Sequence, residues 1–128
     1  MANRYGEAAL IAARQEHSAS NTPQMRWENA VKRLYPTSPA AQRKGSPRGA
    51  FLGLCEEGLV KGIPAGSYSA TRDNKNLALS AVVLLREGTQ SWSISTLWRA
   101  VAGDGGKEHN SQMDIVMALW KNGLLVRG

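Results

Sequence analysis

Apolar residues recur along this chain at intervals of three and four positions, which is the repeat of one face of an α-helix. The alternating pattern of a half-buried strand is missing, and only the short run 124–126 leaves a strand open as an alternative to simple packing. The pattern therefore predicts an all-α fold: a single compact bundle of five to six helices in one helical domain spanning residues 1–128. The expected helices cover about 4–16, 22–34, 47–58, 71–87, 93–101 and 111–122, with a short piece at 38–44.

Capping residues mark where several of these helices start. A Ser or Thr side chain accepts hydrogen bonds from the free N–H groups of a first turn, and proline suits that turn because it has no N–H group. Ser93 is expected to cap one helix, and Ser111 another, with Asp114 three residues later in a pattern similar to a capping box. Sharp corners between packed helices are predicted at three pairs of a capping residue and a proline: Thr22-Pro23, Ser38-Pro39 and Ser46-Pro47.

The Gly-containing helix at about 47–58 is expected to be the centre of the bundle. It carries Phe51, the only phenylalanine of the chain. Each of Gly49 and Gly53 costs about 1 kcal/mol of helix stability relative to alanine, so we expect another helix to approach the backbone closely at these positions. Gly58 is expected to end the helix in a left-handed turn. We interpret Cys55, on the apolar side, as a small buried hydrophobe rather than a nucleophile.

The same segment resembles a known signature. Residues 46–68 read SPRGAFLGLCEEGLVKGIPAGSY and contain Pro-x-x-Ala-Phe-Leu-Gly-Leu-Cys-Glu-Glu-Gly after a basic, Ser-rich stretch. This motif is similar to the signature of an uncharacterised bacterial family of small helical proteins, a domain of unknown function. A Tyr-Gly-Glu-Ala-Ala run at 5–9 resembles the N-terminal region of that family. The resemblance implies a helical fold, and no activity, cofactor or site residue comes with it.

The positive charge of the chain is concentrated in one segment. The net charge is +6 at pH 7, and six basic residues accompany a single acidic one between positions 26 and 48. Such a cluster attracts phosphate groups or acidic protein surfaces. A modest net charge also simply keeps a protein in solution, which is the alternative interpretation. The candidate binding surface consists of Arg26, Lys32, Arg33, Arg43, Lys44 and Arg48.

A second candidate is a polar cluster near the central helix, formed by Glu56, Lys61 and Tyr68 together with Arg48. If these side chains converge in a cleft, they can bind a small anion. Adjacent residues of a helix point about 100° apart, so Glu56 and Glu57 are not expected to work as an acid and base pair. The alternative interpretation is a polar rim around the core.

The number and spacing of histidine and cysteine residues argue against a metal site and against a disulfide. Its two histidines, His17 and His109, and its single Cys55 lack the spacing of metal ligands, so no metal and no cofactor are expected. Both histidines are expected in exposed polar loops. One cysteine excludes an intramolecular disulfide and fits a reducing cytoplasm. Since the chain has no apolar run of about 18 residues and no recognisable signal peptide, we expect a cytoplasmic protein that does not span a membrane.

These observations favour a non-enzymatic binding or regulatory module of bacterial or phage origin, whose basic surface contacts a nucleic acid or an acidic protein partner. The last two helices have a spacing similar to a helix-turn-helix, although apolar residues occupy most of the second one. One alternative is a small inhibitor or defence-related protein acting through protein contacts, for which Trp92 is the tryptophan most expected to be exposed. Another is a small enzyme with an unrecognised site near Arg48, Glu56 and Tyr68. The sequence leaves the partner and the oligomeric state open.

Overall fold

The computed structural model describes residues 4–15, 21–68, 70–103 and 111–126, so His17 and His109 lie outside the described residues. The all-α prediction is confirmed, because the described elements are helices and the strand-like pairing in the described ranges is limited to isolated bridge residues, such as the antiparallel bridge between Val60 and Leu125. The helices are α1 (Tyr5–Arg14), α2 (Pro23–Leu34), the short α3 (Pro39–Gln42), α4 (Gly45–Glu56), α5 (Arg72–Glu87), α6 (Ile94–Ala102) and α7 (Gln112–Lys121).

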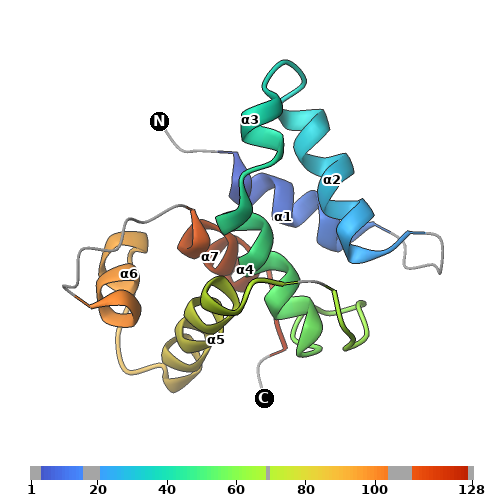
Figure 1. Ribbon diagram of the computed structural model, residues 1–128. Helices are drawn as coiled ribbons and strands as arrows, with labels where there is room; N and C mark the ends of the chain where they lie inside the picture. Colours follow the sequence, from blue (N-terminus) through green and yellow to red (C-terminus); the bar gives the residue numbers. More distant parts are fainter. Residues whose placement is uncertain (1–3, 16–20, 69, 104–110, 127–128) are drawn as a thin grey trace.

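The fourth helix, α4, lies at the centre of the arrangement, with α2 and α3 on one side and α5 and α6 on the other, while α7 packs against both α1 and α4 (Figure 1). Every residue from 49 to 55 is buried. Phe51 has no exposed surface, and its ring centroid lies 5.3 Å from that of the equally buried Trp27 on α2. The predicted central position of this helix is therefore confirmed.

Close packing of α5 against α4 explains the two interior glycines of α4. A Cβ atom at Gly49 would lie 2.5 Å from the Thr71 hydroxyl oxygen, and one at Gly53 would lie 2.7 Å from the Cα atom of Lys75. Both distances are shorter than real Cβ contacts allow. The predicted close approach of another helix is confirmed, and the start of α5 is the segment that makes it.

The predicted end of the central helix is confirmed, and its predicted start is wrong. Gly58 has a left-handed backbone with φ +70°, and the N–H of Leu59 donates to the carbonyl of Leu54 at 3.1 Å. At the other end the helix begins at Gly45, with no side chain capping it, so Ser46 is a residue of the first turn and not its cap. Pro47 is tolerated there because the first N–H groups of a helix have no intrahelical partner.

Most of the other predicted caps are confirmed. Thr22 accepts from the N–H of Met25 at 3.3 Å, and Ser38 caps α3 in the same way. Ser93 exchanges two hydrogen bonds with Thr96 in a capping box. The predicted box at the start of α7 is wrong, because the residue at position 111 has φ 73° and its side chain makes no cap hydrogen bond. A capping side chain needs an extended backbone to reach the first turn.

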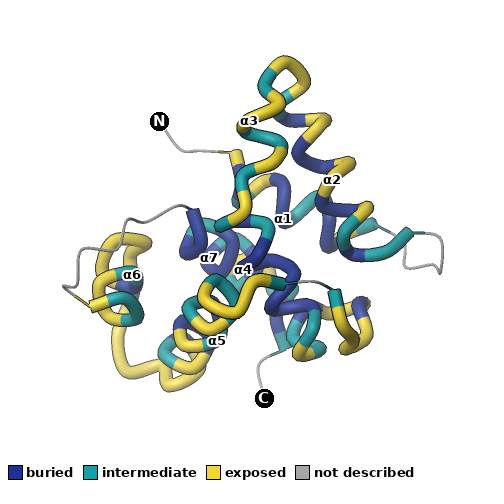
Figure 2. The backbone as a smooth tube through the Cα atoms, in the orientation of Figure 1, coloured by how far each residue is buried: buried dark blue, intermediate teal, exposed yellow. Residues whose placement is uncertain are grey.

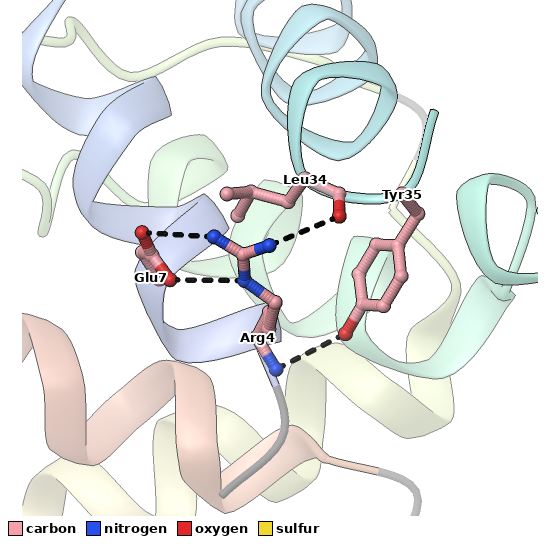
Figure 3. A network of polar contacts seen from close by, with 4 residues as sticks. All are labelled: Arg4, Glu7, Leu34 and Tyr35. Carbon is pink, nitrogen blue, oxygen red and sulfur yellow. Dashed lines mark hydrogen bonds and ion pairs between the residues drawn. The ribbon is translucent and has the colours of Figure 1, made fainter. Parts of the chain in front are cut away.

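A polar network ties the start of α1 to the end of α2 (Figure 3). The Arg4 guanidinium pairs with Glu7 at 3.3 Å and donates to the carbonyl oxygen of Leu34 at 3.4 Å. The backbone N–H of Arg4 donates to the Tyr35 hydroxyl oxygen at 3.0 Å. These contacts fix the corner at which the chain leaves α2 and turns toward α3.

Burial is uneven across the bundle. Figure 2 shows α4 and α7 as mostly buried and α6 as largely exposed. In α5 the buried residues all lie at or after Ala78. In α6 only Leu97 is buried. Trp92, just before α6, is half-buried and packs against the core, so the expectation that it is an exposed tryptophan is wrong. The short segment at 124–126 packs onto the turn after α4, and the N–H of Val126 donates to Leu59 at 2.8 Å.

Candidate functional site

A concave region opens between α2, the end of α3 and the first turn of α4. Its volume is about 530 Å³, which falls within the roughly 300–1,000 Å³ that ligand pockets usually have. Three of the predicted basic residues line it, together with one carboxylate, one amide, one valine and one glycine. We call this region the basic cleft, and its lining residues are Glu28, Val31, Lys32, Gln42, Arg43, Gly45 and Arg48.

Local structure explains how the cleft is assembled. Glu28, Val31 and Lys32 are spaced three and four positions apart on α2, so they share one face of that helix. The Gln42 amide donates to the carbonyl of Tyr35 at 2.7 Å, which holds the end of α3 against the end of α2. The Tyr5 hydroxyl donates to the carbonyl of Ala41 at 2.7 Å and attaches α3 to α1. The short α3 is thereby fixed, and Arg43 follows it directly.

The three cations of the cleft, Lys32, Arg43 and Arg48, are available to a ligand. Within the described residues none of their side chains makes a hydrogen bond or an ion pair. Arg48 is half-buried in α4, whereas Lys32 and Arg43 are exposed. The uncapped first turn of α4 adds a partial positive charge near Gly45. The arrangement can bind an anion with several charge-assisted hydrogen bonds.

Two other residues of the predicted basic surface do not line the cleft. The Lys44 ammonium lies 5.7 Å from the centroid of the Tyr5 ring, a distance typical of a cation–π contact. Arg33 is exposed on α2, next to Lys32, and points elsewhere because adjacent helical residues diverge by about 100°. These two residues add to the positive field around the cleft without lining it.

The assignment of Arg26 to the binding surface is wrong. Arg26 is 1% exposed, and its guanidinium donates to the carbonyl oxygens of Ala12 at 2.8 Å and Ala13 at 3.0 Å, and also to that of Gln15. Burial lowers the pKa of this guanidinium from its ordinary value, although an arginine keeps its proton in proteins. The last carbonyls of a helix have no intrahelical partner. Arg26 satisfies those of α1 and so has a structural role.

Glu56 of the second candidate cluster holds a loop. Its carboxylate accepts from the N–H groups of Tyr68 at 2.8 Å and Ala70 at 3.3 Å, and it pairs with the Lys75 ammonium at 3.0 Å. Burial raises the pKa of the Glu56 carboxyl, but the hydrogen bonds from Tyr68, Lys75 and Ala70 outweigh it and lower the pKa below its ordinary value. Lys75 also pairs with Glu57 at 2.9 Å, and the two carboxylates raise the pKa of Lys75.

The second candidate cluster does not converge on a cleft. The Tyr68 hydroxyl donates to the carbonyl of Pro64 at 2.6 Å, and Lys61 is exposed beside the chain's C-terminal segment. Arg48 lies eight residues before Glu56 on α4, which corresponds to about 12 Å along a helix. The lining of the basic cleft includes none of Glu56, Lys61 and Tyr68. The polar-rim interpretation fits these residues better than a binding cluster.

Two further features of the chain are part of the core. Cys55 has no exposed surface, and burial raises the pKa of its thiol to about 12, which leaves it protonated and unreactive near neutral pH. Helix α7, the second helix of the helix-turn-helix pattern, buries six of its ten residues. It therefore offers little surface to a nucleic acid groove.

A second cavity, of about 330 Å³, lies between α5 and α6. It has no titratable side chain among its lining residues, which are Ser80, Val83, Leu84, Ala100 and Val101. The ranges that the structure covers contain no group of three His, Cys, Asp or Glu side chains suited to a metal ion. Of the helices described, none has the length and apolar character needed to traverse a bilayer.

Comparison with known proteins identifies one relationship. No curated protein and no solved structure matches the chain, whereas a family of unknown function (DUF6979) matches residues 2–126. The chain belongs to this family. The predicted membership of an uncharacterised family is thus confirmed. Since the family carries no assigned activity, the roles of the cleft residues in this member depend on their geometry and chemistry.

Sequence reasoning missed several residues of the cleft in this family member. Val31 and Gly45 carry no charge, and the Gln42 amide becomes relevant only when α3 folds back toward α2. For Glu28 the sequence did contain a feature that could have predicted its place in the cleft. It is the only acidic residue between positions 26 and 48, and it precedes Lys32 by one helical turn.

Proposed function

We propose that this protein is a non-enzymatic nucleic-acid-binding module that holds backbone phosphates in the basic cleft. The observation that carries the proposal is the convergence of Lys32, Arg43 and Arg48 from three segments on one cavity of about 530 Å³, with no partner for their charges among the described residues. Guanidinium groups bind phosphate through paired hydrogen bonds, and clustered cations supply most of the affinity of sequence-independent binding.

The composition of the cleft favours nucleic acid over an acidic protein partner. Protein interfaces concentrate aromatic and apolar anchors at their centre. Among the described lining residues of the cleft none is aromatic, and the one hydrophobic side chain, Val31, is only 1% exposed. Trp92, the aromatic residue considered for a protein contact, packs against the core. A protein partner bound here would depend on charge alone.

The proposal of binding rather than catalysis rests on how the reactive groups are used. Cys55 is buried with a raised pKa, and Glu56 is occupied by three hydrogen-bond donors. Neither group is free to attack or deprotonate a substrate. We also propose that the protein works in the cytoplasm of a bacterium or of a phage-infected cell, where a buried free thiol such as Cys55 stays reduced.

Fluorescence anisotropy with random-sequence DNA and RNA, single- and double-stranded, tests the proposal. We expect binding at about 50 mM salt that weakens steeply toward about 200 mM. Replacing Arg43 or Arg48 by glutamine should weaken binding to all sequences alike. Each substitution should also reduce the slope of log K against log[salt] by about 0.7–0.9 for every phosphate that the variant no longer neutralises.

Arg99→Gln is the matched control, because Arg99 is exposed on α6 and lines neither the basic cleft nor the cavity between α5 and α6. It removes the same charge from a different side of the molecule and should leave the salt slope almost unchanged. Absence of binding to every nucleic acid at low salt would overturn the proposal. Equal losses of affinity in the control and the cleft variants would show that net charge, and not the cleft, carries the binding.

A further inference from the structure

One lining residue of the basic cleft is not explained by phosphate binding. The Glu28 side chain shares the cleft with Lys32, Arg43 and Arg48, and no hydrogen bond or ion pair engages its carboxylate within the described residues. Lys32 follows one turn later on the same face of α2, yet the two side chains are not joined. The cleft therefore offers three free cations and one free carboxylate.

A carboxylate in this position opposes a ligand that consists of phosphate alone, because like charges repel. It favours a ligand that carries hydrogen-bond donors at some distance from its phosphate. A nucleotide with an amino group on its base has both features. A carboxylate can accept from the exocyclic amine of cytosine, whereas uracil presents an acceptor oxygen at the same place and is repelled.

Whether the base edge is accessible decides whether single-stranded or double-stranded nucleic acid fits the cleft. In a duplex the amino group of cytosine is engaged in base pairing, and the edge that remains is read by elements that protrude into a groove. The Glu28 carboxylate lines a hollow instead. In a single strand the bases are free to splay outward, and their Watson–Crick edges are open to side chains.

We propose that Glu28 is a specificity-determining residue that accepts a hydrogen bond from the amino group of a single-stranded base, while Lys32, Arg43 and Arg48 hold the adjoining phosphates. The substrate class is single-stranded nucleic acid with a preference for cytosine over uracil. This inference rests on the proposed function of the cleft. The inference adds a contact with a nucleic acid base to the proposed contacts with the phosphates.

The test compares oligo(dC) with oligo(dU) of equal length, since the bases of these two probes differ only at the amino or carbonyl group and its neighbouring ring nitrogen. Fluorescence anisotropy at neutral pH should give tighter binding of oligo(dC) by a factor on the order of ten. In Glu28→Gln this preference should fall toward one, because an amide both donates and accepts. Binding of oligo(dU) should become tighter in the same variant, because a negative charge has left the cleft.

Glu87→Gln is the matched control, because Glu87 is exposed at the end of α5 and lines neither the basic cleft nor the cavity between α5 and α6. It should leave the preference for oligo(dC) intact. If Glu28→Gln tightens both probes by the same factor, Glu28 only repels phosphate and the inference is wrong. Equal binding of the two probes by the unmodified protein, or tighter binding of oligo(dC) paired with its complementary strand than of oligo(dC) alone, also overturns it. These outcomes leave the proposed function standing, whereas failure to bind any nucleic acid at low salt removes the proposed function itself.

Discussion

The two ends of α4 differ in how their polar groups are used. At the C-terminal end, α5 packs on Gly53, and the Glu56 carboxylate accepts from two backbone N–H groups and from Lys75. At the N-terminal end a Cβ atom at Gly45 would meet nothing within 4 Å, and Arg48 makes no side-chain hydrogen bond or ion pair within the described residues. One helix thus has a closed end and an open end.

The difference separates stability from binding. A buried polar group costs free energy unless it is hydrogen-bonded, so the satisfied groups at the closed end have a structural role. At the open end the charged groups are not engaged within the protein and remain available to a ligand. Like charges held near one another also repel, which lowers the stability of the fold. Substitutions at the closed end should therefore change the free energy of unfolding, and those at the open end should change ligand affinity.

The largest expected effect is that of Gly53→Ala. The new methyl group would meet the Lys75 backbone at 2.7 Å, so α5 must move. Overpacking of this kind typically costs 1–3 kcal/mol, which exceeds the helix propensity that alanine gains, and we expect a net loss of about 2 kcal/mol. Urea denaturation followed by circular dichroism measures it. Gly45→Ala is the control and should change stability by less than about 0.5 kcal/mol, so equal effects of the two substitutions would contradict the comparison.

Glu56→Gln should have a smaller effect that depends on pH. The loss of charge-assisted hydrogen bonds should cost about 1 kcal/mol near neutral pH. Because the folded-state pKa of Glu56 is lowered, its contribution is complete above the unfolded-state pKa of about 4.3 and is lost as the pH falls through the lower folded-state value. Denaturation curves from neutral to acidic pH should therefore converge for the two proteins. A difference that stays constant down to strongly acidic pH would mean that the carboxylate is not ionised in the fold.

Arg48→Gln should have the smallest effect on stability, below about 0.5 kcal/mol, because its side chain is half-buried and makes no ion pair in the described part of the chain. Thermal unfolding followed by circular dichroism measures this. The same variant should bind nucleic acid more weakly in the anisotropy measurement. A large loss of stability would show that Arg48 has a structural role, so that the N-terminal end of α4 would not be reserved for binding.

The candidate site was only partly predictable. The basic segment contributed Lys32, Arg43 and Arg48 to the cleft, because the consecutive helices α2, α3 and α4 that carry or adjoin them pack together. The same segment gave no indication that Arg26 points inward. A long arginine side chain can extend into solvent or fold along the protein, and the choice depended on the last carbonyls of α1, to which Arg26 donates.

Local signals determined the helices of this protein and several of their boundaries. The apolar repeat, the caps at Thr22, Ser38 and Ser93, and the left-handed Gly58 act within one or two turns, so the sequence alone contains them. Tertiary structure decided that α5 is the helix that lies on the glycines of α4, and that a carboxylate shares one cavity with three cations. These arrangements depend on how separate helices pack, and no residue of one helix specifies by itself which residue of another it will meet.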